Sequence, residues 1–141
     1  MGITLESKKG KISLEMGYGA FLTLRKKLAE LCSPEFGKHY DTIDKAPFIY
    51  GREEYFKKFD VKTEELLKRK AVSPKVVDFC LQSDCEGKIH YGACKEIYKH
   101  IKDYDDDFCY GYAGRPDCTM FKDFKDLLKE CIDNKCDLLW W

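Results

Sequence analysis

The sequence predicts an α+β fold, a helix-rich single domain over residues 1–141 with a small antiparallel sheet. Its length of 141 residues is that of one domain. Apolar residues alternate near the start of the chain, and in most later segments they recur every three or four positions. Hydrophobic residues make up 44% of the chain and charged residues 35%. This composition predicts a packed core beneath a highly charged surface.

The sheet is predicted near both ends of the sequence. Residues 3–6 and 11–16 alternate between apolar and polar side chains, and residues 8–10 separate them. This pattern is typical of a β-hairpin. The apolar residues 138–141 are a candidate further strand beside the hairpin.

Between these strands the apolar spacing predicts helices, about five or six of them around one core. Ser33-Pro34 and Ser73-Pro74 are each typical of a helix start, with serine as the N-cap and proline in the first turn. Seven segments have helical features, and from them we expect these five or six helices; they are 20–31, 34–42, 53–59, 63–70, 74–81, 94–101 and 121–132.

Charge is distributed unevenly along the chain. Residues 1–75 carry 16 Lys and Arg against 11 Asp and Glu, and residues 76–141 carry 9 against 14, so their net charges are +5 and −5. We interpret this as attraction between two halves of one fold, because no dense basic stripe indicates a nucleic acid partner. Neither a signal peptide nor a long apolar run is present, so a cytoplasmic protein without a membrane partner is expected.

Eight cysteines occur in the sequence. Without a secretion signal we expect reduced thiols packed in the core, not a disulfide framework. Structural zinc is the alternative, but Cys80/Cys85 and Cys131/Cys136 are spaced more widely than typical zinc pairs. The cysteines are Cys32, Cys80, Cys85, Cys94, Cys109, Cys118, Cys131 and Cys136.

Two acidic segments are candidate metal sites, but the sequence predicts neither a bound metal nor a cofactor. Residues 84–89 resemble the middle of an EF-hand loop, but Gln82 and Ala93 occupy the positions of its first and twelfth ligands. We interpret that segment as a turn between two helices. The acidic run 103–107 could hold Mg²⁺ or Ca²⁺, although such runs between helices are usually solvated loops.

Two glycine-aromatic segments, each before a helix, suggest a ligand site. Glycine allows close approach of a ligand, a helix N-terminus offers free N–H donors, and tyrosine and arginine can stack on a ring or bind an anion. The alternative is two tight turns whose tyrosines pack on the core and whose Arg115 pairs with the acidic run. The candidate ligand-binding residues are Tyr18, Gly19, Tyr110, Tyr112, Arg115 and Asp117.

Trp140 and Trp141 form a large apolar pair. Such a pair either folds back into the core or is buried in a partner. We therefore treat both residues as a candidate interface, including one for a homo-oligomer.

Three parts of the chain resemble known proteins. They are the opening Met1-Gly2-Ile3 with Met16-Gly17-Tyr18-Gly19-Ala20-Phe21, the run Ser83-Asp84-Cys85-Glu86-Gly87-Lys88-Ile89, and the stretch containing Tyr110-Gly111-Tyr112, Phe121-Lys122-Asp123-Phe124 and Cys131-Ile132-Asp133-Asn134. These parts look similar to small uncharacterised proteins of Gram-positive bacteria and their phages. The resemblance implies a bacterial or phage cytosolic setting and carries no transferable chemistry.

The function expected from these observations is that of a non-catalytic binding or interaction protein. Its ligand would be a small anionic, nucleotide-like molecule or a protein partner. The alternative is a small enzyme acting on a nucleotide or a similar anion. Eight cysteines and three histidines allow many chance pairings, and no local signature of nucleophilic catalysis supports one of them.

Overall fold

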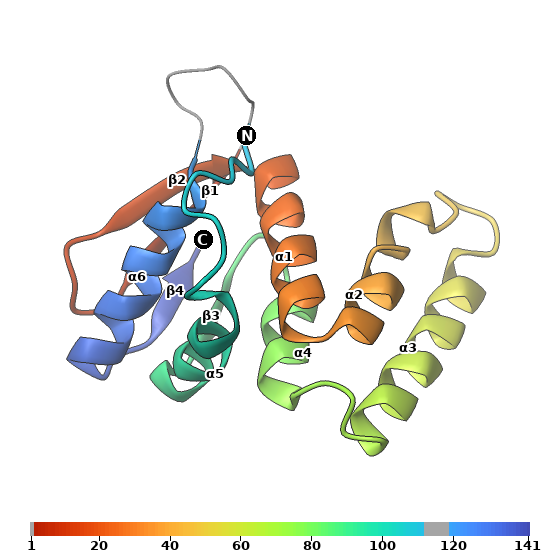
Figure 1. Cartoon of the computed structure of the whole chain (residues 1–141). Helices are drawn as coiled ribbons and strands as arrows, with labels where there is room; N and C mark the ends of the chain where they lie inside the picture. The colour runs from red at the N-terminus through yellow and green to blue at the C-terminus, as the bar shows by residue number, and fades with distance from the viewer. Residues whose placement is uncertain (1, 112–118) are drawn as a thin grey trace.

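Four short strands form one antiparallel sheet in the order β2-β1-β4-β3. The computed structural model describes residues 2–111 and 119–141 (Figure 1). The strands are β1 Gly2–Ser7, β2 Ser13–Gly17, β3 Gly87–Ile89 and β4 Leu138–Trp140. In β1, Leu5 lies opposite Leu14 of β2 and Trp140 of β4. The predicted hairpin and the predicted strand beside it are therefore confirmed.

Six α-helices in the described residues complete the fold, as predicted for a helix-rich α+β protein. Ser33 and Ser73 cap their helices as expected, because each hydroxyl accepts a backbone N–H of the first turn. The helices are α1 Tyr18–Cys32, α2 Pro34–Tyr40, α3 Arg52–Lys68, α4 Pro74–Leu81, α5 Tyr91–Ile101 and α6 Phe121–Asn134, with a 3₁₀ turn at Ile43–Lys45.

Two predictions of local structure were wrong. Residues 53–59 and 63–68 belong to one continuous helix, α3, which ends two residues before the predicted position 70. The Thr63 hydroxyl donates to the Phe59 carbonyl inside this helix and does not cap a new one. Residues 84–89 do not simply join two helices, since Gly87–Ile89 pairs with β4. A glycine is needed there: a Cβ at Gly87 would lie 2.2 Å from the Trp140 ring.

The core lies on one face of the sheet, beneath the helices (Figure 1). Helix α6 packs on β1 and β2, and α4 packs on β3. Phe21, Phe79 and Trp140 meet at its centre, with ring centroids 5.5–6.0 Å apart. No helix in the described part of the chain combines the length and the apolar character needed to cross a bilayer.

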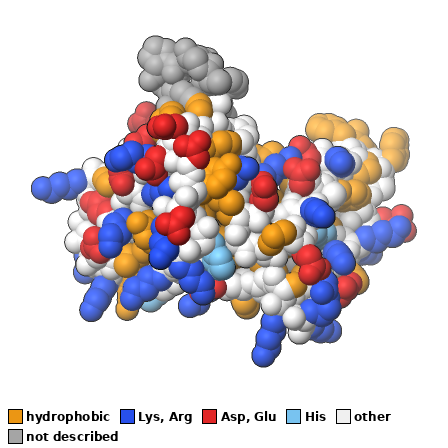
Figure 2. Space-filling view, viewed as in Figure 1, with side chains coloured by type: hydrophobic (Ala, Val, Ile, Leu, Met, Phe, Trp, Pro, Cys, Tyr) orange, Lys and Arg blue, Asp and Glu red, His pale blue; other side chains and the backbone are white. Residues whose placement is uncertain are grey.

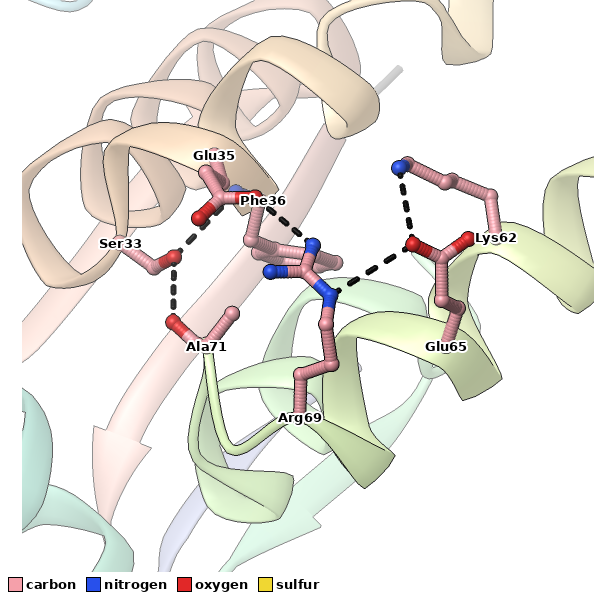
Figure 3. Close-up of polar contacts among 7 residues, drawn as sticks. All are labelled: Ser33, Glu35, Phe36, Lys62, Glu65, Arg69 and Ala71. Carbon is pink, nitrogen blue, oxygen red and sulfur yellow. Dashed lines mark hydrogen bonds and ion pairs between the residues drawn. The ribbon is translucent and has the colours of Figure 1, made fainter.

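Helices α2 and α3 form an arm that packs against α1 and extends away from the sheet (Figure 1). Polar contacts fix the base of this arm (Figure 3). The Ser33 hydroxyl donates to the Ala71 carbonyl at 2.7 Å, and Arg69 pairs with Glu35 at 2.8 Å. Residues of the arm form one wall of a pocket that is also lined by α1 and α4, and this pocket is the candidate site.

Candidate functional site

A pocket of about 520 Å³ opens between α1, α2, the start of α3 and the end of α4. Its buried lining residues, which form the deep part, are Phe21, Arg25, Tyr40 and Cys80. The apolar side chains of Leu22, Ile43, Phe56 and Leu81 also line the pocket. More polar residues complete the lining, namely Tyr18, Gly19, Asp44, Arg52, Gln82 and Asp84.

Arg25 is the most unusual residue of this pocket, because its side chain is charged and only 5% exposed. It lies on the apolar face of α1, four residues after Phe21, and its guanidinium carbon is 4.1 Å from the centre of the Phe21 ring. Nη1 donates to the Gln82 carbonyl at 2.9 Å, and Nη2 donates to the Ser83 carbonyl at 3.3 Å. These bonds join α1 to the turn before β3.

The charge of Arg25 has no carboxylate partner within residues 2–111 and 119–141, and its buried Nε has no acceptor there. Burial lowers the pKa of the guanidinium, and the Tyr40 oxygen opposes that shift. Arginine nevertheless stays protonated in proteins. The deep part of the pocket therefore contains a positive charge that backbone carbonyls, a tyrosine oxygen and aromatic faces stabilise, and the Asp84 carboxylate at the mouth also favours it without forming an ion pair.

The two other polar groups in the deep part are uncharged at neutral pH. The Tyr40 hydroxyl donates to the Cys80 carbonyl at 3.0 Å, and burial raises the pKa of this phenol. Burial likewise raises the pKa of the Cys80 thiol. Neither group can act there as an anionic base or nucleophile, because both remain protonated.

At the mouth of the pocket, acidic and basic side chains are mixed. Asp44 accepts from Lys26 at 2.8 Å, and this hydrogen bond lowers the pKa of its carboxyl group. Arg52 lies over the Phe56 ring, with its guanidinium carbon 5.0 Å from the ring centre. The pKa of the Tyr18 phenol is raised, mainly by its electrostatic interaction with the neighbouring Cys85 side chain. A ligand entering the pocket would pass these groups before it reached Arg25.

The structure brings only part of the predicted site together. Tyr18 and Gly19 line the pocket. Tyr110 is 1% exposed and belongs to the core. This agrees with the alternative interpretation, in which the tyrosines of these turns pack on the core. Tyr112, Arg115 and Asp117 lie outside the described residues.

The two tryptophans have different environments. Trp140 is 1% exposed and its indole N–H donates to the Ser83 carbonyl at 2.9 Å, so it has folded back into the core. It is not accessible to a partner. Trp141 is 54% exposed.

Sequence reasoning missed Arg25, Tyr40, Arg52 and Asp84. A signal for Arg25 was present, since it shares the spacing of the buried residues Phe21, Leu24 and Leu28. A charged residue at such a position must find partners inside the fold, which makes it a candidate for a site. Tyr40 and Asp84 carry no comparable signal, because only the packing of α2 and α4 on α1 brings them to the pocket.

A second cleft is lined by Cys32, Glu96 and His100, which are residue types that can act together in nucleophilic catalysis. His100 Nε2 lies 3.9 Å from Glu96 Oε1. Burial, and then the negative charge of Glu96, raise the pKa of the Cys32 thiol to about 12. The thiol therefore stays protonated at neutral pH and is not an activated nucleophile.

Six cysteines are free thiols, which confirms that part of the prediction; they are Cys32, Cys80, Cys85, Cys94, Cys131 and Cys136. Cys109 differs, because it is disulfide-bonded. No group of three or more His, Cys, Asp or Glu side chains among the described residues is arranged to hold a metal ion. In the acidic run, Asp106 accepts from the buried Lys125 ammonium group at 2.8 Å.

Comparison of the chain with protein-family models, with curated proteins and with solved structures finds no match.

Proposed function

We propose that this chain is a non-catalytic binding protein and that its ligand is a small anion with a flat, apolar body, held in the Arg25 pocket. One observation carries the proposal: the Arg25 guanidinium is deeply buried, lines a pocket and has no carboxylate partner among the described residues. A carboxylate or phosphate is the group that a guanidinium binds best.

The rest of the pocket indicates the shape of the ligand. Its volume of about 520 Å³ lies within the range of roughly 300–1,000 Å³ common for small-molecule sites. Leu22, Ile43, Phe56 and Leu81 offer an apolar surface that suits a ring. Asp84 at the mouth would repel a second acidic group and would accept hydrogen bonds from an amino group. A nucleoside monophosphate and an aromatic carboxylate both meet these requirements.

Calorimetric titration with four named probes tests the proposal. Adenosine monophosphate and benzoate combine an acidic group with a ring, adenosine has the ring without the charge, and inorganic phosphate has the charge without the ring. We expect at least one of the first two to bind more tightly than adenosine and phosphate. If none of the four binds, or if adenosine binds as tightly as its monophosphate, the proposal is wrong. Recovery of the bound probe chemically unchanged distinguishes binding from turnover.

Three variants connect binding to the pocket. Arg25→Lys keeps the charge but loses the planar fork, and Leu81→Trp fills the pocket without changing Arg25. We expect each to weaken binding about tenfold or more, which corresponds to ~1.4 kcal/mol. Arg69→Lys is the matched control, because Arg69 is an exposed arginine paired with Glu35 on the arm. Circular dichroism checks that each variant is folded. Unchanged affinity in both pocket variants would contradict the assignment of the site.

A further inference from the structure

The turn between α2 and α3 exposes three consecutive large apolar side chains. Phe48, Ile49 and Tyr50 are 90%, 70% and 91% exposed. Figure 2 shows hydrophobic side chains gathered at the tip of the arm, where Figure 1 draws the turn between α2 and α3. A large side chain of this kind presents on the order of 150–250 Å², so the turn leaves about 500 Å² of apolar surface uncovered. Patches of this size on soluble monomers are often interaction sites.

The turn that carries these side chains is held by specific contacts. Gly51 adopts a left-handed backbone conformation (φ 80°), which favours glycine, and α3 begins directly after it. Arg52 Nη1 donates to the Pro47 carbonyl at 3.2 Å and so closes the turn. The three side chains are therefore presented from a defined position at the start of α3.

The helix α3 that follows this turn has an exposed outer face. Phe59, Thr63 and Leu66 are the buried residues of the helix. Glu54, Lys58 and Val61 lie on the opposite side, because they are spaced four and three residues apart and are all exposed. Val61 is 70% exposed, although valine normally prefers the interior. This face therefore has charged residues near the turn and an apolar residue further along.

The charges of the first two turns of α3 are self-complementary. Glu53 and Glu54 are followed four residues later by Lys57 and Lys58. If two such helices run antiparallel about a point between residues 55 and 56, the acidic pair of each faces the basic pair of the other. The same arrangement places residue 50 of one copy level with residue 61 of the other, each roughly 8 Å from the centre at about 1.5 Å per residue.

We infer that two copies of this chain associate through this surface, which we call the α3 face and define as residues 48–50, 53, 54, 57, 58 and 61. The apolar turn of each copy covers Val61 of its partner, and the charged pairs fix the antiparallel direction. Two turns of about 500 Å² bury together about 1,000 Å², which is the lower limit expected of a biological interface. The contact is the same on both copies, so it closes as a dimer. This inference does not depend on the ligand of the Arg25 pocket.

Sedimentation equilibrium of the full chain tests the dimer. We expect the mass of the wild type to rise from 16.5 kDa towards twice that value as concentration increases. Tyr50→Ser and Val61→Lys should each weaken the dimer about tenfold or more. Trp141→Ser is the matched control, because it removes an exposed apolar side chain outside the α3 face. The inference is overturned by a wild-type chain that stays monomeric, or by a dimer that weakens only in the control.

A charge-reversal experiment tests the antiparallel direction. One variant carries Glu53→Lys and Glu54→Lys, and the other carries Lys57→Glu and Lys58→Glu. Each variant alone should be monomeric, since like charges then face each other. An equimolar mixture should form a heterodimer, because the all-basic face meets the all-acidic face. Circular dichroism establishes that both are folded. Equal dimerisation of the single variants and the mixture would overturn the proposed pairing.

Discussion

A guanidinium can be buried in this core because aromatic rings and backbone carbonyls surround it in place of a carboxylate. Arg25 has its guanidinium carbon 4.1 Å from the Phe21 ring centre and 5.6 Å from those of Phe79 and Trp140. Guanidinium is weakly hydrated and planar, so it tolerates such surroundings better than an ammonium group would. The same side chain can therefore connect α1 to the turn before β3 and offer charge to a ligand.

At the residue scale, His39 should make stability depend on pH. Its ring stacks on Phe59 at 4.0 Å, and Nε2 lies 2.8 Å from the Thr63 hydroxyl. That hydroxyl donates to the Phe59 carbonyl, so it accepts a hydrogen bond from Nε2–H. Burial lowers the pKa of the imidazole, and the nearby Lys62 charge acts in the same direction, whereas the Phe59 carbonyl and Asp60 oppose it.

Because the folded-state pKa lies below the usual value of about 6.5, the unfolded chain takes up the proton more readily. The stabilisation from neutral His39 is therefore present above pH ~6.5 and is lost as the pH falls below it. The imidazole is partly exposed, so we expect less than about 1 kcal/mol. Urea unfolding between neutral and mildly acidic pH checks this in the wild type and in His39→Phe, which does not titrate. Parallel pH dependences in the two proteins would show that His39 is not responsible.

At the scale of elements, the contact between α1 and α2 depends on Gly37, which has no side chain. A Cβ at Gly37 would lie 2.6 Å from Glu30 Cα and 2.9 Å from Glu30 N, both backbone atoms of α1. The two helices therefore approach closely where Gly37 faces Glu30. The arm, and with it one wall of the pocket, takes its position from this contact.

Gly37→Ala should destabilise the fold by ~1–3 kcal/mol, because backbone atoms must move apart. Gly19→Ala is the matched comparison, since a Cβ there meets nothing within 4 Å and alanine favours a helix. The second variant should be neutral or slightly stabilising. Denaturant midpoints measure both. If the two substitutions change stability equally, the close approach of α1 and α2 at Gly37 does not exclude a side chain there.

Local patterns in the sequence predicted the hairpin, a strand at 138–141 (138–140 in the structure), the serine-capped helices α2 and α4 and the apolar stripes of α5 and α6. They failed for α3, because Thr63 resembles an N-cap although no helix-breaking residue precedes it. They failed for β3, whose three residues become a strand only by pairing with β4. Of the site, Tyr18 and Gly19 could be predicted, because they open a helix after glycine. Tyr40 and Asp84 come to the pocket through tertiary packing, which local patterns do not encode.

At the scale of the whole molecule, the two oppositely charged halves of the sequence are joined by apolar contacts. Every ion pair between described residues links residues of the same half, as Glu35 with Arg69 and Asp106 with Lys125 illustrate. Trp140, in contrast, contacts Phe21 and Phe79 from the first and second halves and belongs to the strand that connects β1 with β3.

Trp140→Ala should therefore lower the free energy of unfolding by ~3–5 kcal/mol, the usual cost of removing a large buried aromatic side chain. Trp141→Ser should cost about 1 kcal/mol or less, because its side chain is half exposed. Chemical denaturation compares the two neighbouring positions. A Trp140 variant as stable as the Trp141 variant would contradict the assignment of Trp140 to the core.

The position of β4 between β1 and β3 also governs when this protein can fold during its synthesis. β1 and β2 leave the ribosome before the other described elements and can form their hairpin, but β4 begins about 120 residues after the end of β2, and contacts of such sequence separation form slowly. β3 has no strand partner until then. The nascent chain must therefore keep Phe21, Phe79 and the open edge of β1 from aggregating until residue 140 has emerged. Its dependence on chaperones should be set by this waiting time more than by its final stability.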